Sequence, residues 1–140
     1  MCHNNLGAVL RDMRNCRAAK QHHREALAIY EKTLGPEHPD VAMCHNNLGV
    51  VLRHQADFVG AKEHHEQALA MYEKTLGSEH PEVAMSHGNL GNVLCDLGDY
   101  ASAREHFEQA LAIYEKTLPP YHPHLRHVRG NLRSLPGQEG

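Results

Sequence analysis

The chain has 140 residues, which is enough for one domain, and its formal net charge is −3 with the histidines counted as neutral. This mild charge argues against nucleic acid or an anionic membrane surface as the main partner. No apolar stretch approaches the roughly 20 residues that a membrane-spanning helix needs, and the start Met1-Cys2-His3 lacks the basic and apolar segments of a signal peptide.

The cysteines give no sign of a metal site, because they form neither a CxxC pair nor an alternating Cys/His ligand set. They are Cys2, Cys16, Cys44 and Cys95. We interpret all four as reduced thiols of an intracellular protein, so a cytoplasmic location is expected.

An internal repeat is the strongest signal in the sequence. The tripeptide Asn-Leu-Gly recurs at residues 5–7, 47–49 and 89–91, a step of about 42 residues, and Asn131-Leu132 continues the series. Three further series keep this step: Ala26, Ala68 and Ala110; Tyr30, Tyr72 and Tyr114; and Pro39, Pro81 and Pro123. The chain is therefore expected to stack copies of one unit, at about residues 1–38, 39–80 and 81–122.

Each copy predicts two helices. In the second copy these are expected over about residues 39–55 and 58–76, separated by a turn at 56–57, because apolar residues recur at helical spacing on both sides. Gly77 stands where a helix end favours a residue that tolerates the left-handed conformation. Pro39 and Pro81 suit a first helical position, and the acidic residue after each complements the helix dipole.

Glycine also recurs inside the first helix of each copy, at Gly7, Gly49 and Gly91. Glycine in a helix interior costs about 1 kcal/mol relative to alanine, so a repeated glycine needs a repeated reason. We expect a close approach of the paired helix, opposite the small residues of the series that begin at Ala19 and Ala26.

The two ends of the chain predict incomplete repeats. Met1 aligns with Met43 and Met85, so the chain is expected to open inside a first helix. Residues 123–135 are expected to form a terminal capping helix, and residues 136–140 a disordered tail. The predicted fold is an all-α, right-handed α-solenoid over residues 1–135, with helix-turn-helix repeats and seven helices.

These residues resemble the tetratricopeptide repeat signature, in which Leu-Gly in the first helix precedes Ala and a large residue in the second. Here they are Leu90, Gly91, Ala103 and Phe107. The longer step, with Asn-Asn-Leu-Gly and His-Pro-Asp-Val-Ala, is similar to the repeats of kinesin light chain and nephrocystin-type proteins. The signature tryptophan is replaced by histidine in every copy, namely His3, His45 and His87. The resemblance implies a role in binding other proteins.

In proteins of this resemblance, the first helices line a concave groove, where asparagines hydrogen-bond the backbone of an extended peptide. The resemblance implies a groove formed by Asn4, Asn5, Asn46, Asn47, Asn89, Asn92, Arg11, Arg53, Met43, Val50 and Met85. The arginines would favour acidic residues in the ligand, and the methionines with Val50 would form pockets for one apolar anchor. The alternative is an asparagine ladder that only ties neighbouring helices together.

Other kinds of site are disfavoured. The lysines with which relatives clamp the acidic tails of heat-shock chaperones have no counterpart here. Most of the fourteen histidines fall into copied series, and the one local cluster is His122, His124 and His127, so no bound metal is expected. No nucleophile has a suitably spaced base, and the acidic pairs lie beside lysine or arginine. The chain is therefore expected not to be an enzyme and to need no cofactor.

Two functional hypotheses remain. The leading one is an interaction module whose groove receives a peptide segment of a partner protein. The rival is a structural spacer, or a self-assembling segment of a longer repeat array, without a groove ligand of its own. Apolar residues at the uncovered amino-terminal end, such as Met1, Val9 and Met13, predict a homodimer through that end. Neither nucleic acid nor a membrane is expected as a partner.

Overall fold

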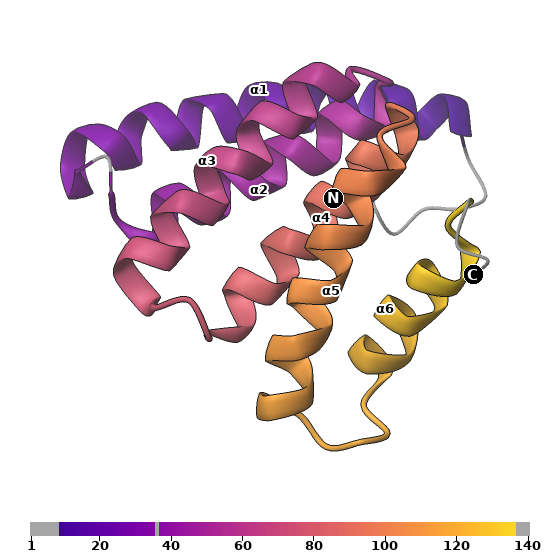
Figure 1. Ribbon diagram of the computed structural model, residues 1–140. Helices are drawn as coiled ribbons and strands as arrows, with labels where there is room; N and C mark the ends of the chain where they lie inside the picture. The colour runs from indigo at the N-terminus through magenta and orange to yellow at the C-terminus, as the bar shows by residue number, and fades with distance from the viewer. Residues whose placement is uncertain (1–8, 36, 137–140) are drawn as a thin grey trace. The chain divides into compact units, whose positions relative to one another are not determined.

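The structure, a computed structural model, describes residues 9–35 and 37–136, and all regular structure within them is helical (Figure 1). The helices are α1 (Val9–Leu34), α2 (Pro39–His54), α3 (Phe58–Leu76), α4 (Pro81–Asp96), α5 (Tyr100–Thr117) and α6 (Pro123–Ser134). No helix in this part of the chain is both long and apolar enough to cross a lipid bilayer.

The chain divides into two compact units, Met1–Met71 and Tyr72–Gly140, so that the last turns of α3 belong to the second unit. In the first unit α1 packs against α2, and the α2–α3 hairpin follows. In the second unit α5 packs against both α4 and α6. The all-α class and the helix-turn-helix repeats are confirmed.

The number of helices differs from the expected seven, because α1 runs without a break through residues 9–34, where two helices and a turn were expected. In the other two hairpins the turn contains a residue with positive φ, Ala56 at 64° and Gly98 at 83°. The equivalent position in the first copy holds Arg14. Arginine favours helix and is strained in the left-handed region, so the helical backbone continues through this position.

The starts of α2, α4 and α6 have proline in the first turn, as predicted, and a histidine as N-cap. In each case the imidazole Nδ1 accepts a hydrogen bond from the backbone N–H two residues later. The N···N distances are 3.0 Å for His38, 3.0 Å for His80 and 3.1 Å for His122. These caps were not predicted, because Ser, Thr, Asp and Asn are the usual residues in this role.

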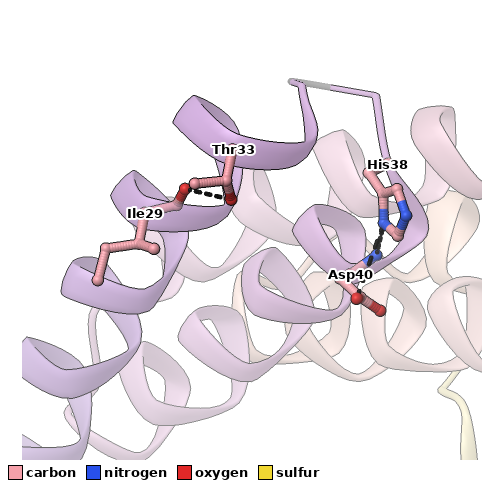
Figure 2. A network of polar contacts seen from close by, with 4 residues as sticks. All are labelled: Ile29, Thr33, His38 and Asp40. Atoms are coloured by element: carbon pink, nitrogen blue, oxygen red, sulfur yellow. Dashed lines mark hydrogen bonds and ion pairs between the residues drawn. The ribbon is translucent and has the colours of Figure 1, made fainter.

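Figure 2 shows the junction between α1 and α2, with His38 aimed at the N–H of Asp40. On the other side of the junction, the Thr33 hydroxyl donates to the Ile29 carbonyl oxygen at 2.9 Å. Gly35, between them, has a φ of 94°, and Gly77 in the next junction has a φ of 92°. The left-handed conformation expected of Gly77 is therefore confirmed, and Gly35 after α1 has the same conformation.

The core of each hairpin is built from the apolar stripes that the sequence indicates. On α2, Val41, Leu48 and Leu52 are almost completely buried, and on α3 the same holds for Ala61 and Ala68. The equivalent residues of α4 and α5 are also buried, namely Val83, Leu90, Leu94, Ala103 and Ala110. Leu125 and Val128 of α6 and Leu135 at its C-cap are buried, while Arg129 reaches Glu115 of α5 at 3.2 Å.

The helical glycines mark a close approach, as predicted, but the atoms they meet are not those of the small residues. A Cβ on Gly49 would lie 2.6 Å from the ring of His65, and one on Gly91 would lie 2.5 Å from Phe107. The glycines thus make room for a large ring on the paired helix. The ring of His65 is only 1% exposed.

Candidate functional site

An open pocket of about 180 Å³ lies in the second unit. Its walls come from three helices, and its residues are Met85, Gly88, Asn89 and Asn92 of α4, Tyr114 of α5, and His124, His127, Val128 and Asn131 of α6. The residues of α6 follow helical spacing along one face of that helix. The pocket therefore joins the first helix of the third repeat to the first helix of the fourth.

Three residues of the predicted groove meet in this pocket: Met85, Asn89 and Asn92. Met85 is 44% exposed, so its flexible side chain stands at the open edge. Gly88 leaves room beside it, because a Cβ at this position would have no atom within 4 Å. The pocket thus has an adaptable apolar rim and free space next to its polar residues.

Three asparagine amides border the pocket without a polar partner in the part of the chain that the structure describes. Asn89, Asn92 and Asn131 are half-buried, and none of their side chains forms a hydrogen bond with another described residue. Each amide offers an acceptor oxygen and two donor hydrogens. Since buried polar groups are nearly always hydrogen-bonded, these amides need water or a ligand.

Aromatic rings of α5 and α6 line part of the pocket. The ring of Tyr114 lies 5.3 Å from that of His124, centroid to centroid, and His124 in turn lies 4.7 Å from His122. Burial, reinforced by the Glu82 carboxylate, raises the pKa of Tyr114. Tyr114 therefore presents a neutral hydroxyl rather than a charge.

Asn46 lies inside the α2–α3 hairpin instead of on an open surface. Its Oδ1 is 2.8 Å from Nδ1 of His65, and the residue is only 7% exposed. Because an amide oxygen only accepts, the Nδ1–H of His65 must donate in this contact. This position fits the alternative interpretation, in which asparagines tie helices together.

Some of the remaining predicted residues lie on α2, and the others lie outside the part of the chain that the structure describes. Asn47 and Val50 are half-buried on α2, whereas Met43 and Arg53 are exposed. Asn4, Asn5 and Met1 lie outside the described residues, and so do the side chains of Arg11, Val9 and Met13. The same holds for residues 137–140 of the predicted tail.

Two pairs of histidines recur at equivalent places. Nδ1 of His45 lies 2.9 Å from Nδ1 of His64, and the same atoms of His87 and His106 are also 2.9 Å apart. In each pair the ring centroids are 5.1 Å apart. Burial, followed by the neighbouring imidazole, lowers the pKa of both His45 and His87 to about 4. In each pair one Nδ1–H donates to the other Nδ1, so the accepting ring is unprotonated at that atom.

The histidine series do not assemble into a metal centre within the described residues. No group there of three or more His, Cys, Asp or Glu side chains could hold an ion. In the predicted local cluster, His122 caps α6 and contacts the ring of His124, while His124 and His127 line the pocket. The histidines therefore have packing, capping and pocket-lining positions.

The model of the tetratricopeptide repeat family matches residues 1–74 and again residues 45–116. The chain belongs to the tetratricopeptide repeat family. The two matched ranges begin 44 residues apart, at residues 1 and 45, which is close to the repeat step of about 42 residues. A search of curated protein sequences found no significant match.

Two of the solved structures similar to this tetratricopeptide repeat chain come from one candidate kinesin light chain. A candidate kinesin light chain of Podosopora anserina, with nearly identical TPR-like repeats, is 31% identical with a TM-score of 0.79, over 89% of this chain and 60% of that one. A glutamine-to-methionine variant of that protein gives the same identity and TM-score, over 89% and 59%. BtubC (BKLC) from P. vanneervenii is 24% identical with a TM-score of 0.79, over 87% and 49%. The chain thus spans about half to three fifths of these proteins.

Sequence reasoning about the tetratricopeptide repeats missed most of the pocket outside α4. Tyr114 was noted only as a repeated tyrosine, and His124 and His127 only as a local histidine cluster. The available signal was Asn131, which continues the asparagine series into the fourth repeat. Had that series been followed, α6 would have been included as a groove wall.

Proposed function

We propose that this tetratricopeptide repeat chain is a non-catalytic interaction module that binds an extended peptide segment of a partner protein. Tetratricopeptide repeats generally serve as scaffolds for protein–protein interaction. One observation carries the proposal for this chain: three half-buried amides around one pocket have no partner among the described residues. A peptide backbone offers the donors and acceptors that these amides lack.

The arrangement of the amides favours a ligand that contacts both first helices. Asn89 and Asn92 come from α4 and Asn131 from α6, so a single chain crossing the pocket reaches all three. The space beside Gly88 admits a backbone, and Met85 adapts to a range of apolar side chains. The affinity is expected to be about micromolar, since ordering a flexible peptide offsets much of the gain.

The same mode of binding is proposed for the first unit. On α2, Asn47 with Met43 and Val50 repeats the pattern of Asn89 with Met85, and Asn4 and Asn5 would continue it in the first copy. The positive charges of Arg11 and Arg53 would favour acidic residues in the partner. That preference predicts weaker binding at high salt.

Peptide selection tests the proposal without requiring that the natural partner be identified. The full chain is used to select binders from a random-peptide display library, and each selected peptide is measured by calorimetry against Asn89→Leu and Asn131→Leu variants. Each variant is expected to lose about 1–3 kcal/mol of binding free energy, because a ligand group loses its hydrogen-bond partner. Gln109 is an exposed residue of α5 outside the pocket, so Gln109→Leu removes an amide there and serves as the matched control.

Two outcomes would contradict the proposal. If the variants bind every selected peptide as well as the parent chain, the amides are not the binding groups. If no peptide is selected and light scattering shows concentration-dependent association instead, the spacer or self-assembling segment is favoured. Association through the amino-terminal end, with Met1, Val9 and Met13 at the contact, would then be tested by substituting these three residues.

A further inference from the structure

The two hairpins α2–α3 and α4–α5 place a large ring against a helical glycine in the same way, but the ring and the residue next to it differ. At equivalent positions, the first carries Asn46 and His65 and the second carries Gly88 and Phe107. Both large rings are about 1% exposed and lie against a helical glycine, at 2.6 Å and 2.5 Å from a Cβ built there. The place of the ring is therefore the same in both hairpins, while its chemistry changes from imidazole to phenyl.

The surroundings of His65 suit only a neutral ring. Its Nδ1 lies 2.8 Å from the Asn46 oxygen, and its Nε2 lies 2.6 Å from the position of a Cβ on Gly49. Protonation would add an N–H at the edge packed against this glycine, where no carboxylate lies in contact among the described residues. A buried charge without a partner is costly, so the folded hairpin resists proton uptake at this ring.

The charged groups around the α2–α3 hairpin reinforce this resistance. Burial, followed by His64 and by Arg53 of α2, lowers the pKa of His65 to about 4. Burial, followed by Arg24 of α1, lowers the pKa of His64, against the opposing effect of Glu63 and of Asp57. The contact of His45 with His64 holds only while one Nδ1 stays unprotonated.

The α4–α5 hairpin has fewer such groups. Its ring at the equivalent place is Phe107, which cannot titrate. Its histidine pair, His87 and His106, has a nearby carboxylate, because Oε2 of Glu73 lies 3.9 Å from Nε2 of His87. Even so, the pKa of His87 is lowered to about 4, as is that of His45, so the two histidine pairs are matched and His65 is the titratable ring that differs between the hairpins.

We propose that the α2–α3 hairpin is an acid-sensitive element, which opens on proton uptake under conditions that leave the α4–α5 hairpin closed. Unfolded histidines accept protons near pH 6.5, whereas folded His45, His65 and His87 do so only near pH 4. His45 and His87 occupy equivalent positions, so the α2–α3 hairpin exceeds the other by His65. The stability that these histidines contribute is complete above pH 6.5 and is lost as the pH falls from there toward 4. Opening would remove the surface formed by Met43 and Asn47, so any partner held there would be released in acid.

Hydrogen exchange of the full chain tests the proposal. Amide protection is measured by mass spectrometry at pH 7.5 and pH 5.0, with correction for the intrinsic exchange rate. Protection of α2 and α3 is expected to fall on the order of 30-fold more than that of α4 and α5. This is the change in the folding equilibrium at pH 5.0 produced by one histidine whose pKa is 6.5 when unfolded and about 4 when folded. An equal loss in both hairpins would overturn the proposal.

The two hairpins supply their own matched variants. Asn46→Gly with His65→Phe transfers the second pair into the first hairpin, and is expected to abolish the excess loss of protection at pH 5.0. Gly88→Asn with Phe107→His is expected to make α4–α5 acid-sensitive. If a swapped chain does not fold at pH 7.5, NMR titration of His65 in the parent chain tests the proposal instead. A His65 ring that titrates above pH 6 in the folded state would refute it.

Discussion

The backbone of Gly49 lies so close to His65 that a Cβ there would come within 2.6 Å of its ring. Gly49→Ala is therefore expected to destabilise the chain by about 1–3 kcal/mol, because the buried ring has to move and overpacking of a core costs this much. Urea unfolding measures the change. The cost should appear although alanine is the better helix former.

Gly88→Ala is the control for this substitution, since a Cβ at Gly88 meets no atom within 4 Å. It is expected to stabilise the chain by about 1 kcal/mol through helix propensity alone. If both alanine variants changed the free energy of unfolding equally, the contact of Gly49 with His65 would not be what disfavours a side chain at position 49.

The histidine N-caps predict a second pair of variants. His80→Ala removes the acceptor of the Glu82 N–H and is expected to cost about 1 kcal/mol in the free energy of unfolding. His80→Asp keeps an acceptor at the start of α4 and adds a charge that complements the helix dipole, so it should at least restore the stability. Thermal unfolding distinguishes the two, and an alanine variant as stable as the parent would argue against the cap.

The turns between paired helices predict opposite effects of reciprocal changes. Ala56 has a φ of 64°, where a side chain is strained, so Ala56→Gly is expected to stabilise by about 1 kcal/mol. Gly98, at 83° in the equivalent turn, should lose a similar amount on change to alanine. Chemical denaturation provides both values, and two changes of the same sign would be inconsistent with this account.

The carboxylate beside His87 predicts a change in titration. Oε2 of Glu73 lies 3.9 Å from Nε2 of His87, and Glu73→Gln removes the negative charge that favours a proton on the ring. The pKa of His87, already lowered to about 4, should fall further, as NMR titration of its ring signals can show. Glu79→Gln is the control, because Glu79 pairs with Lys116 at 3.0 Å instead.

Helix boundaries were predictable wherever proline and glycine punctuate the chain. The expected ranges 39–55 and 58–76 agree with α2 and α3 to within one residue. The prediction differed from the structure in α1, where the repeat pattern suggests a turn but Arg14 does not favour its backbone conformation. The prediction followed the repeat pattern and disregarded the helical preference of Arg14, which the structure follows.

The pocket was only partly predictable, for a geometric reason. Periodicity on α4 placed Met85, Asn89 and Asn92 on one face, and the pocket has all three. It could not show that Tyr114 and His124 would meet across α5 and α6, since this depends on the crossing of the helices. The histidine pairs were likewise visible as copied residues, but copying explained their recurrence without revealing their contact.

The lengths of the first helices have a consequence for any partner. α2 and α4 each contain 16 residues, which at about 1.5 Å per residue makes each of them about 24 Å long. A fully extended peptide advances about 3.3 Å per residue, so about seven residues lie alongside one such helix. A shorter fragment of a natural partner would leave part of the helix uncovered, which sets the minimum size of a peptide worth synthesising.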